Sequence, residues 1–315
     1  MLPTVNQTRP RYVMNFFSLI VLSLLMSFSY SSLAAASEEL FQERTLRTGF
    51  YLKSFPDLAR VDLEVALRFW SDEVGQEVGI SSEVYIYDNL QQMRNDFDQG
   101  KINFIVASTL LVVNAFDQKQ LADGYKIILN GSGAEDKLLV VRHKGSGLKG
   151  FEGMLGKDLS LLNYDSISAM YANLLSLKFS GKKAAKLFKT INYEVKSNQL
   201  IYQLFFNKTD VILVYQATYE LACELNPQIR QQTYVASVLP QIPRGVGFFH
   251  RSVPVEFREF VLTEIEKLDT YLRGRQLLAL FKGEKTVRSN LSDLDTTKQL
   301  QKRYQQLLKQ HGIKQ

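Results

Sequence analysis

Between residues 45 and 109 the chain alternates strand-like and helix-like segments, and this order constrains the fold more than any other feature. Segments 45–50, 83–87 and 102–106 are short and rich in apolar and β-branched residues, which is typical of strands. The segments between them have the spacing of amphipathic helices. The order therefore predicts an α/β fold, in which ligands bind beyond the carboxyl ends of the strands.

The two helices of this region have recognisable ends. We expect the first to span 61–78 and to stop at Gly79, and the second to be capped by Asp88 and closed by Gly100. Helical spacing predicts one core face on the first helix. That face comprises Val61, Val65, Ala66, Phe69, Trp70 and Val74.

The central stretch 159–175, LSLLNYDSISAMYANLL, reads as a strand at 159–162, a polar turn at 163–168 and a helix from about Ala169. Hydroxyls and backbone N–H groups at such a helix N-terminus favour an anion. An ordinary capped helix explains the same residues, because Asp and Ser are common N-caps. This stretch alone leaves both interpretations open.

The second half repeats a device of the first. Residues 93–106 and 201–214 both read as a helix end, a tight turn and a strand. Asn207 stands where Gly100 stood, and Asn also tolerates the left-handed conformation of a helix end. Asp210 stands where Asn103 stood. Two lobes built on one plan explain this similarity, and chance likeness of two α/β turns is the alternative.

The remaining elements are less distinctive. Strands are expected at 125–129, 137–142, 234–239 and 246–249. The Gly/Ser-rich break at 130–134 indicates a crossing between lobes or a plain hairpin loop, and 240–243 (PQIP) a stiff connection back. A long helical region at 257–281, bent near Gly274, and a polar surface helix at 292–311 complete the chain.

The N-terminus has the three parts of a secretory signal peptide. Arg9 and Arg11 precede an apolar run at 16–26, and small residues ending at Ala36 follow. We expect export with cleavage after Ala36. An uncleaved membrane anchor is the alternative, although the apolar run is short for a membrane-spanning helix.

Composition argues against several functions. The formal net charge of +6 falls to +4 when the two arginines of 1–36 are removed. No basic block with interleaved aromatic residues occurs, which argues against nucleic acid as a partner. Cys223 is the only cysteine, so neither an internal disulfide nor a thiolate metal cluster can form. We expect Cys223 to be a small buried residue.

Catalytic motifs are scarce. His143, His250 and His311 lack the spacing of metal ligands. The sequence contains no Gly-x-Ser-x-Gly elbow, no P-loop and no Gly-x-Gly-x-x-Gly. The lack of a nucleophile–base pair favours binding over catalysis, with an enzyme on this fold as the rival. No cofactor is expected.

Six short stretches carry a resemblance to a known family. They are 46–56, 88–103 (D-x₄-M-x₆-GKIN), 163–171, 206–211 (FNKTDV), 224–227 (ELNP) and 274–281 (GRQLLALF). Their order along 45–285 resembles the phosphate/phosphite/phosphonate-binding component of ABC importers, a periplasmic solute-binding protein of type II. The resemblance implies two lobes, each a mixed, mostly parallel sheet flanked by helices, that close on a ligand. We expect a signal peptide at 1–36, lobe 1 at 37–134 plus 240–290, lobe 2 at 135–239 and a polar helix at 291–315.

The resemblance also implies a binding site. The family holds its anion with a hydroxyl-rich turn, which Ser166 and Ser168 match in this chain. Ser108 and Thr109 match the facing loop of lobe 1. The expected ligand-binding residues are Ser166, Ser168, Ser108, Thr109, Phe55, Tyr215 and Asp210.

The identity of the ligand depends on the residues that would contact it and on two positions where this sequence differs from the family's pattern. Phe55 lies where an aromatic ring often covers the ligand, and Asp210 or Tyr215 where the family reads its remainder. Ile167 replaces the middle hydroxyl of the family's turn, and Asn103 its usual acid. A missing hydrogen bond to a charged ligand costs about 1.5–3 kcal/mol, so the ligand's identity stays open.

The expected function is capture of a small phosphate-, phosphite- or phosphonate-like anion in the periplasm for a membrane permease, by a monomer that is not an enzyme. The alternative is the same fold acting as the sensing subunit of a membrane histidine kinase or diguanylate cyclase.

Overall fold

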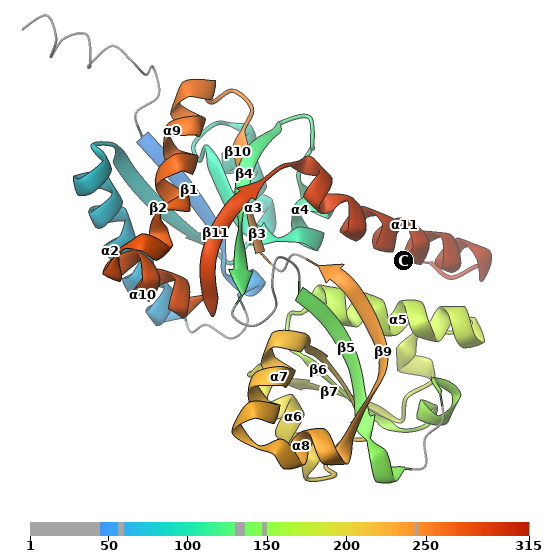
Figure 1. Cartoon of the computed structure of the whole chain (residues 1–315). Helices are drawn as coiled ribbons and strands as arrows, with labels where there is room; N and C mark the ends of the chain where they lie inside the picture. Colours follow the sequence, from blue (N-terminus) through green and yellow to red (C-terminus); the bar gives the residue numbers. More distant parts are fainter. Residues whose placement is uncertain (1–44, 56–59, 130–135, 147–149, 243–244, 315) are drawn as a thin grey trace, which may run out of the picture. The chain divides into compact units, whose positions relative to one another are not determined.

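The structure is a computed structural model that describes residues 45–55, 60–129, 136–146, 150–242 and 245–314 (Figure 1). The expected signal peptide lies outside these residues. The described strands form two sheets. The six-stranded sheet has the order β11-β4-β10-β3-β1-β2 and the five-stranded sheet the order β7-β6-β8-β5-β9. We call the first sheet with its helices lobe 1 and the second lobe 2; both belong to one compact unit, Glu43–Gln315.

Both sheets are mixed, as expected. In lobe 1, β1 runs parallel to β2 and β3, and β10 runs antiparallel to β3 and β4. In lobe 2, β6 runs parallel to β7 and β8, and β5 runs antiparallel to β8 and β9. The strands of lobe 1 are β1 (Thr45–Tyr51), β2 (Ser81–Tyr87), β3 (Phe104–Ser108), β4 (Leu121–Leu129), β10 (Gly245–His250) and β11 (Gly283–Ser289). Those of lobe 2 are β5 (Asp136–His143), β6 (Asp158–Leu162), β7 (Thr190–Glu194), β8 (Val211–Tyr215) and β9 (Thr233–Ile242).

Helices cover both faces of the lobe 1 sheet. Successive side chains of a strand point to opposite faces, and those of β3 are apolar on both, so each face has its own apolar core. Phe104 packs on Phe249, with ring centroids 4.5 Å apart. Ile105 belongs to the opposite core with Met93 and Phe97. The helices are α2 (Arg60–Val78), α3 (Leu90–Asp98), α4 (Thr109–Ala115), α9 (Val255–Glu266) and α10 (Leu272–Leu280).

Helix α2 forms where predicted, but the predicted core face is wrong at Val61, Val65 and Phe69; the side chains of Trp70 and Val74 lie outside the described residues. Val61, Val65 and Phe69 are 68%, 64% and 48% exposed, whereas Leu63 and Leu67 are buried. The buried face continues to Ser71, whose hydroxyl donates to the carbonyl of Ser82 in β2, 2.6 Å away. The helix has a polar residue, Ser71, on its buried side and apolar residues on its exposed side. A prediction from the spacing of apolar residues therefore chose the wrong side of the helix.

The helix ends are mostly as predicted. Gly79 and Gly100 both have φ of +71°, the left-handed conformation of a helix end. The cap of α3 is Asn89 and not Asp88: the Asn89 side chain accepts the amide of Gln92 at 3.1 Å. The Asp88 carboxylate instead pairs with the guanidinium of Arg60.

The long helical region near the C-terminus is two helices, α9 and α10, with a short 3-10 turn at Leu268–Thr270 between them. The break precedes Gly274, which lies inside α10. A Cβ at 274 would stand 2.0 Å from the carbonyl oxygen of Leu268, so only glycine permits this close approach.

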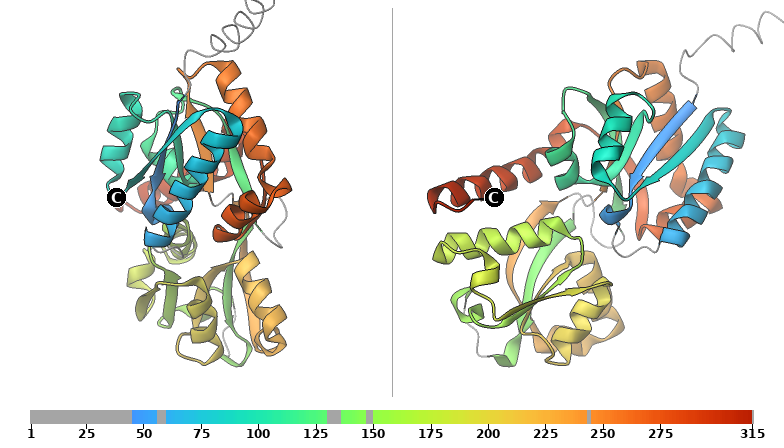
Figure 2. Two further views of the ribbon diagram at one scale, coloured as in Figure 1. Left: turned by 90° about the vertical axis from the view of Figure 1, so that its left-hand side faces the viewer. Right: turned by 180° about the vertical axis from the view of Figure 1, so that it is seen from behind.

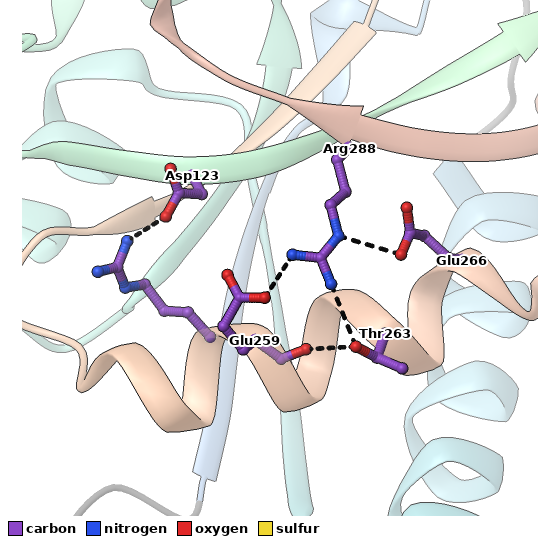
Figure 3. A network of polar contacts seen from close by, with 6 residues as sticks. Asp123, Glu259, Thr263, Glu266 and Arg288 are labelled. Carbon is purple, nitrogen blue, oxygen red and sulfur yellow. Dashed lines mark hydrogen bonds and ion pairs between the residues drawn. The ribbon is translucent and has the colours of Figure 1, made fainter.

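Strand β11 was not predicted from the sequence. Its Arg288 forms ion pairs with carboxylates of α9 (Figure 3). Arg288 of β11 donates to the carboxylates of Glu259 and Glu266 at 2.5 and 3.1 Å. Arg258, also on α9, donates to Asp123 of β4 at 2.7 Å. The exposed pairs of Arg288 contribute little stability each, and with the pair of Arg258 they connect α9 to two strands of the sheet.

Lobe 2 is built in the same way. Helix α5 (Ser166–Ser180) covers one face of its sheet, and α6 (Ser197–Phe205), α7 (Gln216–Leu225) and α8 (Pro227–Gln232) cover the other (Figure 1). Cys223 of α7 is buried and unbonded to another cysteine, as expected.

The repeated device is present in both lobes. Gly100 and Asn207 are both left-handed, with φ of +71° and +56°. The Asn103 side chain accepts the amide of Arg47 in β1 at 2.8 Å. Asp210 accepts the amide of Asp158 in β6 at 2.9 Å. In each lobe, one side chain just before a strand (β3 or β8) thus bonds to the backbone near the amino end of the neighbouring parallel strand (β1 or β6).

The last helix, α11 (Asp295–Gln310), is not merely a surface helix. Its Leu300 is buried in the core of lobe 2, in a cluster that also includes Leu110 of α4. The helix lies alongside α5 and also contacts α4 (Figure 2). It therefore packs against both lobes. None of the described helices has an apolar stretch of the length that a membrane crossing needs.

Candidate functional site

A cavity lies where the carboxyl ends of β1, β3, β6 and β8 come together, the position at which α/β sheets bind ligands. Its lining comes from both lobes: Lys53, Ser54, Ser108, Tyr164, Asp165, Ser166, Ile167 and Tyr215. The space open to the centres of water-sized groups in this cavity is about 30 Å³. That is room for about two water molecules or one small oxyanion.

The lobe 1 wall supplies a cation and two hydroxyls. Lys53 and Ser54 follow β1, and Ser108 ends β3 and precedes α4. The backbone amide of Ser108 donates to the Ser54 hydroxyl at 3.0 Å, which fixes the two loops against each other. The Lys53 ammonium lies 5.6 Å from the centre of the Tyr164 ring, a cation–π distance that connects this wall to lobe 2.

The lobe 2 wall is the start of α5. Tyr164 precedes it in the left-handed conformation, with φ of +60°. Asp165 is the N-cap: its carboxylate accepts the amide of Ser168 at 3.2 Å and the hydroxyl of Ser168 at 2.5 Å. The Tyr215 hydroxyl donates to the same carboxylate at 3.3 Å.

The helix begins earlier than predicted, at Ser166 and not near Ala169. Two of its first amides are already engaged, because Ser166 N–H donates to the Tyr164 carbonyl at 3.0 Å and Ser168 N–H to Asp165. The turn is therefore both a cap and a cavity wall. At least two of its amides are not free to bind a ligand.

The structure brings three of the expected site residues together. Ser108, Ser166 and Tyr215 all line the cavity. Ser168 and Thr109 each lie close in sequence to a lining residue but are completely buried. The Ser168 hydroxyl donates to Asp165 and so supports the start of α5.

Two expected site residues lie elsewhere. The Phe55 ring packs against Phe50 and Phe281, with centroids 6.3 and 5.3 Å away. Asp210 precedes β8, at the opposite end of the strand from Tyr215, where it binds the backbone of Asp158. Its carboxylate has a structural partner in the sheet, so we leave Asp210 out of the proposed site.

Four lining residues were not among those predicted from the sequence: Lys53, Ser54, Tyr164 and Asp165. The first two stand in the loop at the carboxyl end of the first predicted strand, so the rule that ligands bind beyond strand ends could have found them. Tyr164 and Asp165 lie within the predicted turn at 163–168. Tyr164 has the left-handed backbone conformation, and the Asp165 carboxylate accepts from Tyr215, which is fifty residues away in the sequence. Neither feature is visible in the local sequence.

The comparisons with known proteins agree with this architecture. The family model described as "ABC transporter, phosphonate, periplasmic substrate-binding protein" matches residues 54–294. Comparison with curated proteins by sequence gives no significant match.

Solved structures share the fold at low identity. The binding protein component of an ABC phosphonate transporter from Pseudomonas aeruginosa is 14% identical with a TM-score of 0.61, over 84% of this chain and 88% of that one. PhnD1 from Prochlorococcus marinus, in complex with methylphosphonate, is 14% identical with a TM-score of 0.60, over 83% and 98%. A Xanthomonas citri protein bound to ATP is 13% identical with a TM-score of 0.59, over 84% and 98%. Because the family model matches more than half of the 315 residues, the chain belongs to the periplasmic substrate-binding proteins of phosphonate ABC transporters, which are binding components and not enzymes.

Proposed function

We propose that this protein captures a small oxyanion of the phosphonate class in the cavity between Lys53 and Ser166. The observation that carries the proposal is the lining itself: Ser54, Ser108 and Ser166, which carry hydroxyls, and Lys53, which carries an ammonium, line one space with room for a small oxyanion. Hydroxyls and ammonium groups donate hydrogen bonds to oxyanion oxygens. Methylphosphonate bound to PhnD1 of Prochlorococcus marinus supports this ligand class.

The partners follow from the family. A binding component of an ABC transporter has a small-molecule ligand and a membrane permease. We propose that the chain reaches the periplasm after cleavage behind Ala36 and acts there as a monomer. The sensing role, which the sequence left as an alternative, has no support from the comparisons.

The test is a calorimetric titration of the purified protein with methylphosphonate, phosphite and phosphate, each in a separate experiment. Ser166→Ala removes one hydrogen bond to a charged ligand, which is worth about 1.5–3 kcal/mol, or tenfold or more in Kd. Ser180→Ala is the matched control, because Ser180 is exposed at the other end of the same helix and donates only to the Ser176 carbonyl.

We expect at least one phosphorus oxyanion to bind, with Kd weakened by Ser166→Ala and unchanged by Ser180→Ala. Binding that ignores the Ser166 substitution would place the ligand elsewhere. Absence of binding by all three oxyanions would refute the proposed ligand class.

A further inference from the structure

A carboxylate, that of Asp165, belongs to the wall of a cavity whose lining also includes Lys53 and three serines. Asp165 accepts three hydrogen bonds, from the amide and hydroxyl of Ser168 and from the hydroxyl of Tyr215. A carboxylate has about four acceptor positions and no hydrogen to donate. About one position is left for the cavity, and only a group that carries a hydrogen can use it.

The charges of the lining balance. Among the described residues that line the cavity, the charged side chains are Lys53 and Asp165, one positive and one negative. The ammonium can pair with one ligand charge, and a second negative charge would face the carboxylate without compensation. Within a partly buried site such like-charge proximity is unfavourable, because screening by water is reduced.

Resting on the function proposed above, we infer that Asp165 makes the cavity selective for oxyanions that still carry a proton. The ligand would be a singly ionised phosphonate whose P–O–H donates to Asp165, while its other oxygens accept from Lys53 and the serine hydroxyls. A sulfonate of the same shape and charge has no such hydrogen, so its third oxygen would meet the carboxylate directly.

A purely structural role for Asp165 makes a different prediction. As N-cap of α5 it would support the fold without distinguishing ligands, and Asn is about as good a cap as Asp. Asp165→Asn therefore keeps the cap, while its amide replaces an acceptor-only group by one that can donate. The substitution separates the two roles within one side chain of nearly the same size.

The experiment compares methylphosphonate with methylsulfonate by calorimetry at pH about 5, where a phosphoryl group with a second pKa near 6 is singly ionised. We expect the native protein to bind methylphosphonate at least tenfold more tightly than methylsulfonate. In Asp165→Asn the ratio should fall to about threefold or less, mainly through tighter binding of methylsulfonate. Melting temperatures of both proteins serve as the control for folding.

The outcomes separate the two proposals. If the native protein binds methylphosphonate and the ratio is the same in Asp165→Asn, the selectivity role is overturned while the proposed function stands. If the native protein binds neither ligand, the proposed function fails and the selectivity role fails with it. If Asp165→Asn does not fold, Asp165→Ser, which also caps the helix and removes the charge, must lower the ratio in the same way.

Discussion

Truncation of Leu300 to alanine tests whether α11 is an integral part of the packing. Leu300 is 7% exposed and lies in the cluster that joins α11 to lobe 2 and to Leu110 of α4. Leu300→Ala removes three carbon atoms, worth about 0.8 kcal/mol each, and adds a term for the cavity left behind. We expect a loss of about 3 kcal/mol in the free energy of unfolding. For a chain of this size that corresponds to about 6 °C in Tm.

The assay is thermal unfolding by calorimetry, with Gln306→Ala as the control. Gln306 is exposed on the same helix, and alanine is an excellent helix former, so its Tm should stay within about 1 °C of the native value. A Tm for Leu300→Ala equal to that of Gln306→Ala would refute the packing of α11 described above. A low-temperature transition of its own would show instead that α11 melts separately from the lobes.

Two further predictions concern buried polar contacts. Asn103→Ala and Asp210→Ala should each cost about 1–3 kcal/mol in urea unfolding, because a strand amide loses its acceptor, whereas Asp210→Asn should cost less because the amide oxygen can still accept. The ion pair of Lys126 with Asp293 is 2.7 Å long and mostly buried. Burial by itself raises the pKa of Asp293. Hydrogen bonds to its carboxylate from Lys126, Ser289 and Asn290 outweigh burial, so the pKa lies below its usual value. A carboxyl whose pKa is lowered by folding stabilises the protein above its unfolded pKa of about 3.9 and loses this contribution as the pH falls further. Lys126→Met should therefore cost about 2 kcal/mol at pH 7, and urea unfolding should show the difference shrinking below pH 4; a difference independent of pH would contradict the assignment.

Much of the fold could be predicted because local patterns agree with it. The glycine ends of α2 and α3 and the left-handed Asn207 lie where the sequence indicated, and the strand predicted at 102–106 forms two residues later, as Phe104–Ser108. The patterns failed where a segment has two apolar faces or none. Helix α2 carries one apolar stripe inside and another outside, and the polar β11, with the sequence GEKTVRS, gives no apolar signal for a strand.

The candidate site was predictable in position more than in chemistry. Ser108 and Tyr215 each end a strand of a parallel pair, and Ser166 follows one, so the order of elements places all three at the carboxyl ends of strands, where the cavity lies. The contacts of Asp165 could not be read in this way. They depend on where the hydroxyl of Tyr215 falls after both β8 and α5 have packed, which is a consequence of tertiary structure alone.

The side-chain bonds of Asn103 and Asp210 lie at the amino ends of their parallel strands, and the cavity lies at the carboxyl ends. These two bonds between strands are thus separated in space from the residues that line the cavity. Substitutions among the lining residues leave those two bonds in place, so the cavity can change its contacts with a solute while the connection between the parallel strands of each lobe stays as it is.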